Sequence, residues 1–286
     1  MLLAIDAGNT HTVFGLFNGR RLKKTWRVPS QPSHLRRFAR RLPQVCDVIV
    51  SSVVPSLRPE FVRIAKKVSR HPPLFVQPTM AMPIRVRLKN PREAGQDRIV
   101  NAVAAYTRWK CGLIIVDLGT ATTCDVVTPK GDYIGWTISP GIGMANRALH
   151  EKTALLPLAP IKKPRRAIGN STVTAIQSGV YYGYIGLIDG LITRLKKELR
   201  FPVKIIATGG LSSVIAKAAK TIDVVDPNLT IRGLQRLHEW NRPRFLLVPQ
   251  ILLNFIVGSD PMQGQGLPFE TEDYPQSQPD TRLKNT

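Results

Sequence analysis

Apolar residues and turn residues alternate in the same order at two places along the chain. The first copy opens with the apolar run Leu2–Asp6 and the turn Ala7-Gly8-Asn9-Thr10. A second apolar run covers residues 11–17, an Asn-Gly pair follows, and a third run covers residues 22–28. Short apolar runs bounded by such turns predict three consecutive antiparallel strands.

The same layout returns about one hundred residues later. An apolar run at residues 113–117 ends in Asp117, and the turn Leu118-Gly119-Thr120-Ala121 follows. Further runs cover residues 122–127 and 133–138, with a turn at 128–131 between them. Each copy places an aspartate at the end of its first strand and a glycine two residues later. We therefore expect two lobes of similar construction, as an internal duplication would produce.

Helical spacing of apolar residues occurs between and after these copies. It predicts helices over residues 33–41, 59–69, 97–109 and 173–198, the last of which the glycines at 183–190 could interrupt. An apolar strand at 204–207 leads into Thr208-Gly209-Gly210 and a further helical stretch at 211–219. We expect one lobe over residues 1–111, a second over 112–257, and a disordered tail rich in Pro, Gln and acidic residues over 258–286.

Composition narrows the class of protein. The 286 residues suit two domains, and we expect neither a signal peptide at residues 1–6, whose apolar stretch is short, nor a membrane span, since no apolar run reaches the length required. Three scattered cysteines suggest reduced thiols and a cytoplasmic location. Lys and Arg exceed Asp and Glu by 22. Such a charge permits binding to nucleic acid or an acidic membrane. However, the sequence has no basic motif with interleaved aromatic residues and no zinc-ligand spacing. We favour a basic solvated surface that attracts anionic nucleotides, with no nucleic-acid or membrane partner.

The two aspartate turns predict a phosphate site. Glycine in the turn lets backbone N–H groups approach a phosphate closely, and the aspartate at the strand end can hold Mg²⁺ between phosphate oxygens. A single turn of this kind is more often an ordinary hairpin. The second copy favours function, because two such turns could clamp one polyphosphate from opposite sides. The glycines of Thr208-Gly209-Gly210 would admit a flat nucleoside, although a lone Gly-Gly pair is weak support.

The helix expected at residue 97 begins with Gly95-Gln96-Asp97-Arg98. The helix dipole favours Asp97 in the first turn but disfavours Arg98 there. A ligand carboxylate would explain Arg98, since guanidinium pairs with carboxylate through two hydrogen bonds. Asp97 could then accept a proton from a substrate hydroxyl. Farther along, Ser171 or Thr172 could cap the long helix or bind substrate.

The order and spacing of seven motifs resemble the type III pantothenate kinases from Met1 to about Gly233. The motifs are Asp6-x-Gly-Asn-Thr10, Ser51-Ser-Val-Val-Pro55, Gly95-x-Asp-Arg98 with Asn101, Asp117-x-Gly-Thr-Ala-Thr122, Ile138-x-Pro-Gly141, Gly169-Asn-x-Thr172 and Thr208-Gly-Gly210. The resemblance implies an α/β fold of two actin-like (ribonuclease H-like) lobes. Each lobe would hold a mixed five-stranded sheet with flanking helices, and a nucleotide cleft would lie between them.

This resemblance also implies the activity, which is ATP-dependent phosphorylation of pantothenate, the first step to coenzyme A. It implies a homodimer that uses Mg²⁺ and a monovalent cation, K⁺ or NH₄⁺. Asp97 would be the catalytic base, Asp117 the monovalent-cation ligand, and Asp6 would hold Mg²⁺ through the phosphates. The pantothenate site would comprise Gly95, Gln96, Asp97, Arg98 and Thr172, completed across the dimer. The ATP site would comprise Asp6, Ala7, Gly8, Asn9, Thr10, His11, Thr12, Val13, Thr120, Gly209 and Gly210.

The chain departs from the family pattern at two positions near the acceptor. Leu88 stands where relatives often carry Tyr, and Trp136 stands where a second glycine is usual. The positive charge is also higher than the family leads us to expect. These departures leave two alternatives, a kinase for another small hydroxy acid or sugar, and a non-catalytic relative that binds nucleic acid or a regulator. The intact set Asp6, Asp97 and Asp117 favours the kinase, because a pure binding protein would not need all three.

Overall fold

The computed structural model of the chain describes residues 1–77 and 79–242. The tail expected over residues 258–286, and the end of the second lobe expected to reach residue 257, lie outside the described residues. Within them, no helix combines the length and apolar character needed to span a membrane.

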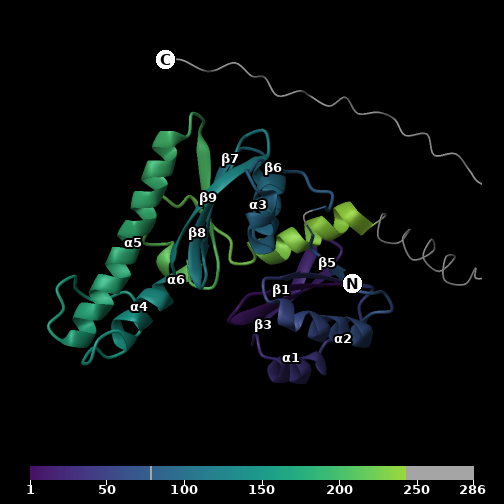
Figure 1. The fold of residues 1–286 in the computed structure, drawn as a ribbon, viewed down its shortest axis with the longest axis horizontal. Helices are drawn as coiled ribbons and strands as arrows, with labels where there is room; N and C mark the ends of the chain where they lie inside the picture. Colours follow the sequence, from purple (N-terminus) through teal and green to yellow (C-terminus); the bar gives the residue numbers. More distant parts are fainter. Residues whose placement is uncertain (78, 243–286) are drawn as a thin grey trace, which may run out of the picture. The chain divides into compact units, whose positions relative to one another are not determined.

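The first sheet has five strands in the order β3-β2-β1-β4-β5 (Figure 1). Its strands are β1 (Leu2–Ala7), β2 (His11–Asn18), β3 (Arg21–Pro29), β4 (Asp47–Ser52) and β5 (Leu74–Phe75). The pairs β1–β2 and β2–β3 are antiparallel, and β4 runs parallel to β1. The predicted three-stranded opening of the first lobe is confirmed.

The second sheet has six strands in the order β11-β10-β7-β8-β9-β6. Its strands are β6 (Arg85–Val86), β7 (Gly112–Leu118), β8 (Ala121–Val127), β9 (Asp132–Pro140), β10 (Val203–Thr208) and β11 (Val224–Val225). The resemblance implied five strands in this sheet, and the structure has six, so that prediction is wrong for the second lobe. The unpredicted strand β6 precedes residue 111 yet pairs in parallel with β9. A strand of two residues is too short to show an alternating pattern.

Two helices cover one face of the first sheet. They are α1 (Pro32–Ala39) and α2 (Arg58–Val68), the latter preceded by the 3₁₀ turn η1 (Pro55–Leu57). Leu35 and Phe61 from these helices pack with Leu3, Ile5 and Phe14 of the sheet, and all five side chains are fully buried. The alternation along β1 sends Leu2, Ala4 and Asp6 to the opposite face.

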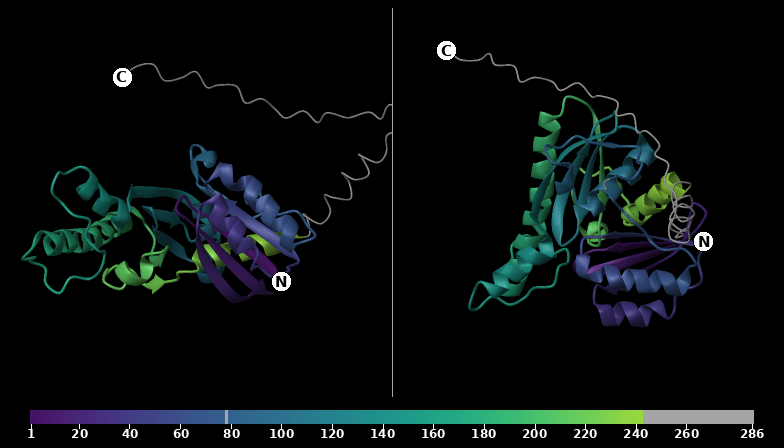
Figure 2. Two further views of the ribbon diagram at one scale, coloured as in Figure 1. Left: turned by 90° about the horizontal axis from the view of Figure 1, so that it is seen from below. Right: turned by 45° about the vertical axis from the view of Figure 1, so that its right-hand side comes forward.

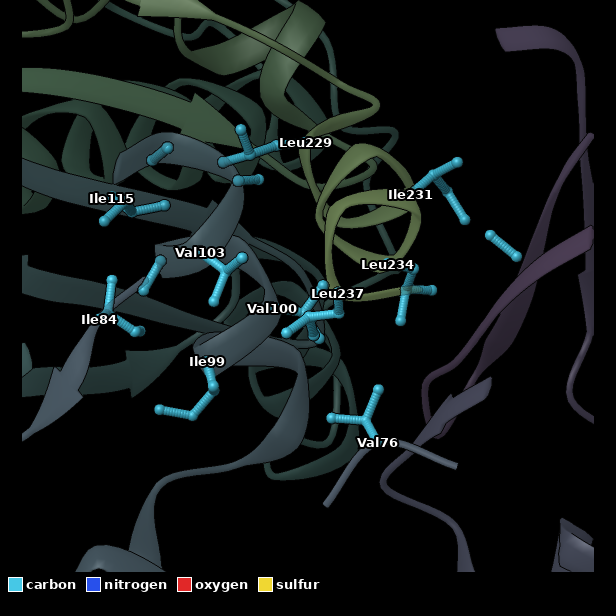
Figure 3. Packing of buried hydrophobic residues seen from close by; sticks show 14 of the residues in the cluster. Val76, Ile84, Ile99, Val100, Val103, Ile115, Leu229, Ile231, Leu234 and Leu237 are labelled. Atoms are coloured by element: carbon cyan, nitrogen blue, oxygen red, sulfur yellow. The ribbon is translucent and has the colours of Figure 1, made fainter. Parts of the chain in front are cut away.

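Helix α3 (Gln96–Trp109), which follows the 3₁₀ turn η2 (Pro91–Glu93), packs against β4 of the first sheet and β7 of the second. A helix at residues 229–242 lies beside it, and Figure 3 shows Val100 of α3 facing Leu234 and Leu237 of that helix. The two backbones are close enough that a β-carbon at Gly233 would come within 2.2 Å of the Val100 carbonyl oxygen. The apolar spacing does not predict this helix, because Gly233 and the charged residues between its leucines obscure the helical pattern.

The other face of the second sheet carries α4 (Ile142–Glu151), α5 (Thr172–Glu198) and the short α6 (Ser212–Ile215) (Figures 1 and 2). The helix expected over 211–219 is thus limited to four residues. Helix α5 is continuous, so the glycines at 183–190 do not interrupt it. Gly183 and Gly186 lie on its exposed side, whereas Tyr184 and Ile188 pack onto the sheet. Burial of that apolar face holds the helix despite its glycines.

Candidate active site at the junction of the two turns

The two aspartate-bearing turns meet in the folded chain. The hydroxyl groups of Thr10 in the first turn and Thr120 in the second are 3.2 Å apart. Asp6 lies near the end of β1 and Asp117 near the end of β7, each on the side of its strand that faces α3. The first turn of α3 carries Asp97. The structure therefore brings together three carboxyl groups that are far apart in the sequence.

Burial and mutual repulsion perturb these carboxyl groups. The pKa of Asp6 rises to about 8, first because partial burial disfavours the charged form and then because Asp97 and Asp117 carry like charge. The pKa of Asp117 rises to about 7 through burial and the charges of Asp97 and Asp125, although a hydrogen bond from Asn101 of 3.0 Å opposes the rise. Carboxyl groups in this state gain most from a bound cation, which would restore their ionised forms.

The first turn is held by its own hydrogen bonds. The Gly8 N–H donates to the His11 carbonyl oxygen over 3.1 Å, and Ser30 Oγ donates to the Gly8 carbonyl oxygen over 2.7 Å. Thr12 is fully buried, with its hydroxyl 2.9 Å from that of Ser30. Of the predicted ATP residues in the first turn and its flanking strands, Ala7 and Thr12 are thus part of the framework. The side chains of Asn9 and Thr10 are exposed at the turn.

The second turn is braced by the loop after β10. Thr208 pairs with Asp117 in the parallel β10–β7 register. Gly209 has φ of +92°, in the left-handed region that favours glycine, and a β-carbon there would approach Asp117 Oδ1 to 2.5 Å and Leu118 backbone atoms to 2.7 Å. The Thr-Gly-Gly sequence is thereby explained by its close approach to the second aspartate.

The beginning of α3 is tied to the first sheet. Gly95 is the N-cap residue, and Gln96 Oε1 accepts a hydrogen bond of 3.3 Å from the N–H of Ser52, the last residue of β4. Asp97 Oδ1 accepts from the Arg98 N–H over 2.9 Å, and Asp97 is partly exposed. Its carboxylate is therefore oriented by the helix start yet accessible to a ligand.

Arg98 lies against a polar network that the sequence motifs do not predict. Its guanidinium stacks over the Trp136 ring at 4.6 Å, and its Nη1 is buried without a hydrogen-bond partner among the described residues. Beside it, the fully buried Asp125 accepts hydrogen bonds from Tyr133 Oη at 2.5 Å and Thr123 Oγ1 at 2.8 Å. Burial raises the pKa of Asp125 to about 6 against the lowering effect of those hydrogen bonds. A charged residue inside an apolar strand was the signal that could have revealed the network.

Trp136 is partly buried between Arg98 and Tyr133, with its ring stacked 6.4 Å from that of Tyr133. Leu88 packs at the margin of the core that contains α3. Both departures from the family pattern thus fill apolar space.

Thr172 and Asp97 of one chain do not lie together. It is the exposed first residue of α5, and Ser171 rather than Thr172 caps the helix, accepting from the Thr174 N–H over 3.3 Å. Helix α5 packs on Ile114 and Val116, whereas α3 packs on Leu113 and Ile115 of the same strand. Thr172 and Asp97 therefore belong to helices on opposite faces of the second sheet.

Solved structures with the same arrangement show the fold class. A Campylobacter jejuni protein assigned to the Baf family of transcriptional activators matches with a TM-score of 0.55 and 21 % identity, covering 84 % of this chain and 99 % of that one. A Sinorhizobium meliloti protein assigned as a 2-dehydro-3-deoxygalactonokinase matches with a TM-score of 0.53 and 11 % identity, covering 84 % and 98 %. These likenesses concern the fold alone, and they confirm the expected α/β fold of two actin-like lobes.

Sequence comparison makes the assignment specific. The sequence model of the type III pantothenate kinases matches residues 2–194. The type III pantothenate kinase of Anaeromyxobacter sp. (strain Fw109-5) is 46 % identical over 256 residues, which cover 85 % of this chain and all of the relative. That of Myxococcus xanthus is 43 % identical, covering 84 % and 99 %. The chain belongs to the type III pantothenate kinase family, as its motifs predicted.

Proposed function

We propose that this protein transfers the γ-phosphate of ATP to the primary hydroxyl of pantothenate, giving 4'-phosphopantothenate for coenzyme A synthesis. The observation that carries the proposal is the junction of the two turns, where the charge of Asp97 acts on both Asp6 and Asp117. Such an arrangement suits phosphoryl transfer, which depends on positioning and on neutralising phosphate charge.

Asp97 would act as the general base. The pantothenate hydroxyl oxygen forms a bond to the γ-phosphorus as the bond from that phosphorus to the β–γ bridging oxygen breaks. ADP leaves, and the hydroxyl proton passes to the Asp97 carboxylate. Arg98 would pair with the pantothenate carboxylate, because its buried Nη1 has no hydrogen-bond partner in the described chain. Gly95 and Gln96 would line the same site.

The carboxyl groups fit the expected cations. Asp6 would hold Mg²⁺ through the nucleotide phosphates, and Asp117 would bind K⁺ or NH₄⁺ beside Gly209, where a β-carbon would crowd Asp117 Oδ1. When bound, the cations supply the charge that neutralises the polyphosphate. The described residues contain no group of three or more His, Cys, Asp or Glu side chains placed to hold one metal ion.

A homodimer would complete the acceptor site. Thr172, expected to bind pantothenate, lies on α5 on the opposite face of the sheet from Asp97. Apolar side chains of the same helix are exposed, Val173 at 40 % and Tyr182 at 39 %. Gly179, Gly183 and Gly186 of α5 have open space at their β-carbon positions. This apolar face would suit close packing with a second copy.

Complementation between variants tests the shared site. Asp97→Asn and Thr172→Val chains are prepared separately, unfolded together and refolded as a mixture. A shared site predicts that the mixture regains activity that neither variant shows alone, because one of its two sites then holds both Asp97 and Thr172. A mixture with no more activity than its parts, or a monomeric mass in analytical ultracentrifugation, would contradict the homodimer.

The activity itself is tested by ADP release coupled to NADH oxidation, with and without pantothenate and with K⁺ or Na⁺. A panel of hydroxy acids and sugars tests the alternative acceptors that Trp136 and Leu88 could admit. Pantothenate-dependent release that needs K⁺ is the expected result. Release with another acceptor in preference to pantothenate would refute the assignment, and salt-sensitive retention on DNA without ADP release would favour a binding protein. The cytoplasmic location stays a prediction.

A further inference from the structure

Arg27 of β3 shares one face of the first sheet with Asp6. In the antiparallel register, Asp6 lies opposite Val13 of β2, and Val13 lies opposite Arg27. Directly opposed residues project to the same side of a sheet. That side is the one that packs towards α3, since Leu2 and Ala4 of the same strand row belong to the α3 core. Arg27 is therefore directed to the side of the sheet on which the two turns meet.

The Arg27 guanidinium lies between the first turn and the loop after β10. Its Nη2 is 3.3 Å from His11 Nδ1. A β-carbon built at Gly210 would be 2.4 Å from its Nη1, which places the guanidinium against that glycine. Arg27 thus contacts residues on both sides of the expected phosphate site, His11 from the first lobe and Gly210 from the second.

The charge of Arg27 is not neutralised by a neighbouring acid. Among the described residues it forms no ion pair with a carboxylate. At longer range it opposes the rise in the pKa of Asp6. Burial, and then the charge of Arg27, lower the pKa of His11, which favours the neutral imidazole, the form that can accept a hydrogen bond from Arg27. The remaining guanidinium N–H groups are available to an anion beside the two turns.

We propose that Arg27 binds the terminal phosphates of the nucleotide. This inference rests on the proposed kinase function, and it adds a residue outside the phosphate-turn motifs. A guanidinium presents several N–H donors in one plane and matches two phosphate oxygens, so it suits a diphosphate or triphosphate chain. Its contribution depends on those phosphates, and a bare nucleoside gains nothing from it.

Calorimetric titration of the full chain with MgATP, MgADP and adenosine tests the proposal. Arg27→Ala is expected to raise the Kd for MgATP and MgADP about tenfold or more, as loss of a charged hydrogen-bonded pair implies. The Kd for adenosine is expected to stay within about twofold, because adenosine has no phosphate for the arginine to bind. Arg27→Lys keeps the charge but loses the planar arrangement of N–H donors. Its Kd for MgATP is expected to lie between those of the wild type and of Arg27→Ala.

Lys23→Ala is the matched control, because Lys23 is an exposed cation of the same strand and its loss changes the net charge equally. Equal weakening of MgATP and adenosine by Arg27→Ala, unchanged MgATP affinity, or an equal effect from Lys23→Ala would overturn the inference. Wild-type protein that binds MgATP while Arg27→Ala binds it equally well would leave the kinase proposal standing. Wild-type protein that binds no nucleotide would refute both.

Discussion

Replacing Asp6 by Asn should stabilise the nucleotide-free protein, and more so as the pH rises. The pKa of this carboxyl group is about 8 in the folded protein against an ordinary 3.8. Between these two values the folded chain holds a proton that the unfolded chain has lost, so the free energy of unfolding falls as the pH rises. Asparagine carries no ionisable group and removes this contribution.

The size of the effect follows from the pKa difference. One proton bound in only one state changes the free energy of unfolding by about 1.4 kcal/mol per pH unit. From pH 5 to pH 7 the Asp6 contribution therefore has a ceiling of about 3 kcal/mol, which partial exposure of the carboxyl group reduces. Asp117 and Asp125, with pKa values raised to about 7 and about 6, give the wild type further slope of the same sign. The difference between wild type and Asp6→Asn isolates the share of Asp6.

Urea unfolding followed by tryptophan fluorescence, at pH 5, 6, 7 and 8 with EDTA and without nucleotide, measures this difference. Asp132→Asn is the control, because the pKa of Asp132 is lowered in the folded protein, whereas that of Asp6 is raised. Burial acts to raise the pKa of Asp132, but hydrogen bonds and charges of Arg85 and Arg87 lower it overall. Its contribution is present throughout this pH range and is lost only in stronger acid. Parallel stability curves for wild type and Asp6→Asn, or a variant that is less stable at pH 8, would refute the electrostatic account of the site.

Three substitutions test other parts of the structure. Tyr133→Phe removes the donor to Asp125, and we expect the KM for pantothenate to rise about tenfold while the KM for ATP is unchanged, in steady-state assays. Trp136→Ala removes the ring beneath Arg98 and should raise the KM for pantothenate about three- to tenfold; a lowered KM would show that the indole obstructs the acceptor. The buried Glu60 carboxylate forms ion pairs with Arg36 of α1 and Arg63 of α2, and Glu60→Gln weakens both pairs. This change should lower the free energy of unfolding by about 1–2 kcal/mol and leave kcat unaltered. Reduced kcat in a fully folded Glu60→Gln protein would contradict its assignment to the framework.

Local pattern was sufficient to predict the elements that carry the phosphate turns. Both three-stranded openings and α3 occur where apolar spacing placed them, because each is long enough for its period to show. The two-residue strand β6 has no period, and it joins the second sheet only through its position next to β9. Continuity of α5 likewise depends on the sheet beneath it, which local glycine content does not reveal.

The candidate site could be predicted only as far as its motifs extend. The Asp6 and Asp117 turns each carry a local signal, and duplication suggested that they meet. Arg27 gives no such signal, since its importance comes from a hairpin register and from the approach of Gly210 in the other lobe. The Asp125–Tyr133 pair is similarly created by the pairing of adjacent strands.

Pantothenate-dependent ADP release by Asp97→Asn, compared with wild type at saturating MgATP and K⁺, tests the central claim most directly. Loss of the general base should reduce kcat by about 10²–10⁴-fold, while calorimetry shows an unchanged Kd for MgATP. A variant that turns over at the wild-type rate would contradict the proposal that Asp97 deprotonates the acceptor beside the two aspartate turns.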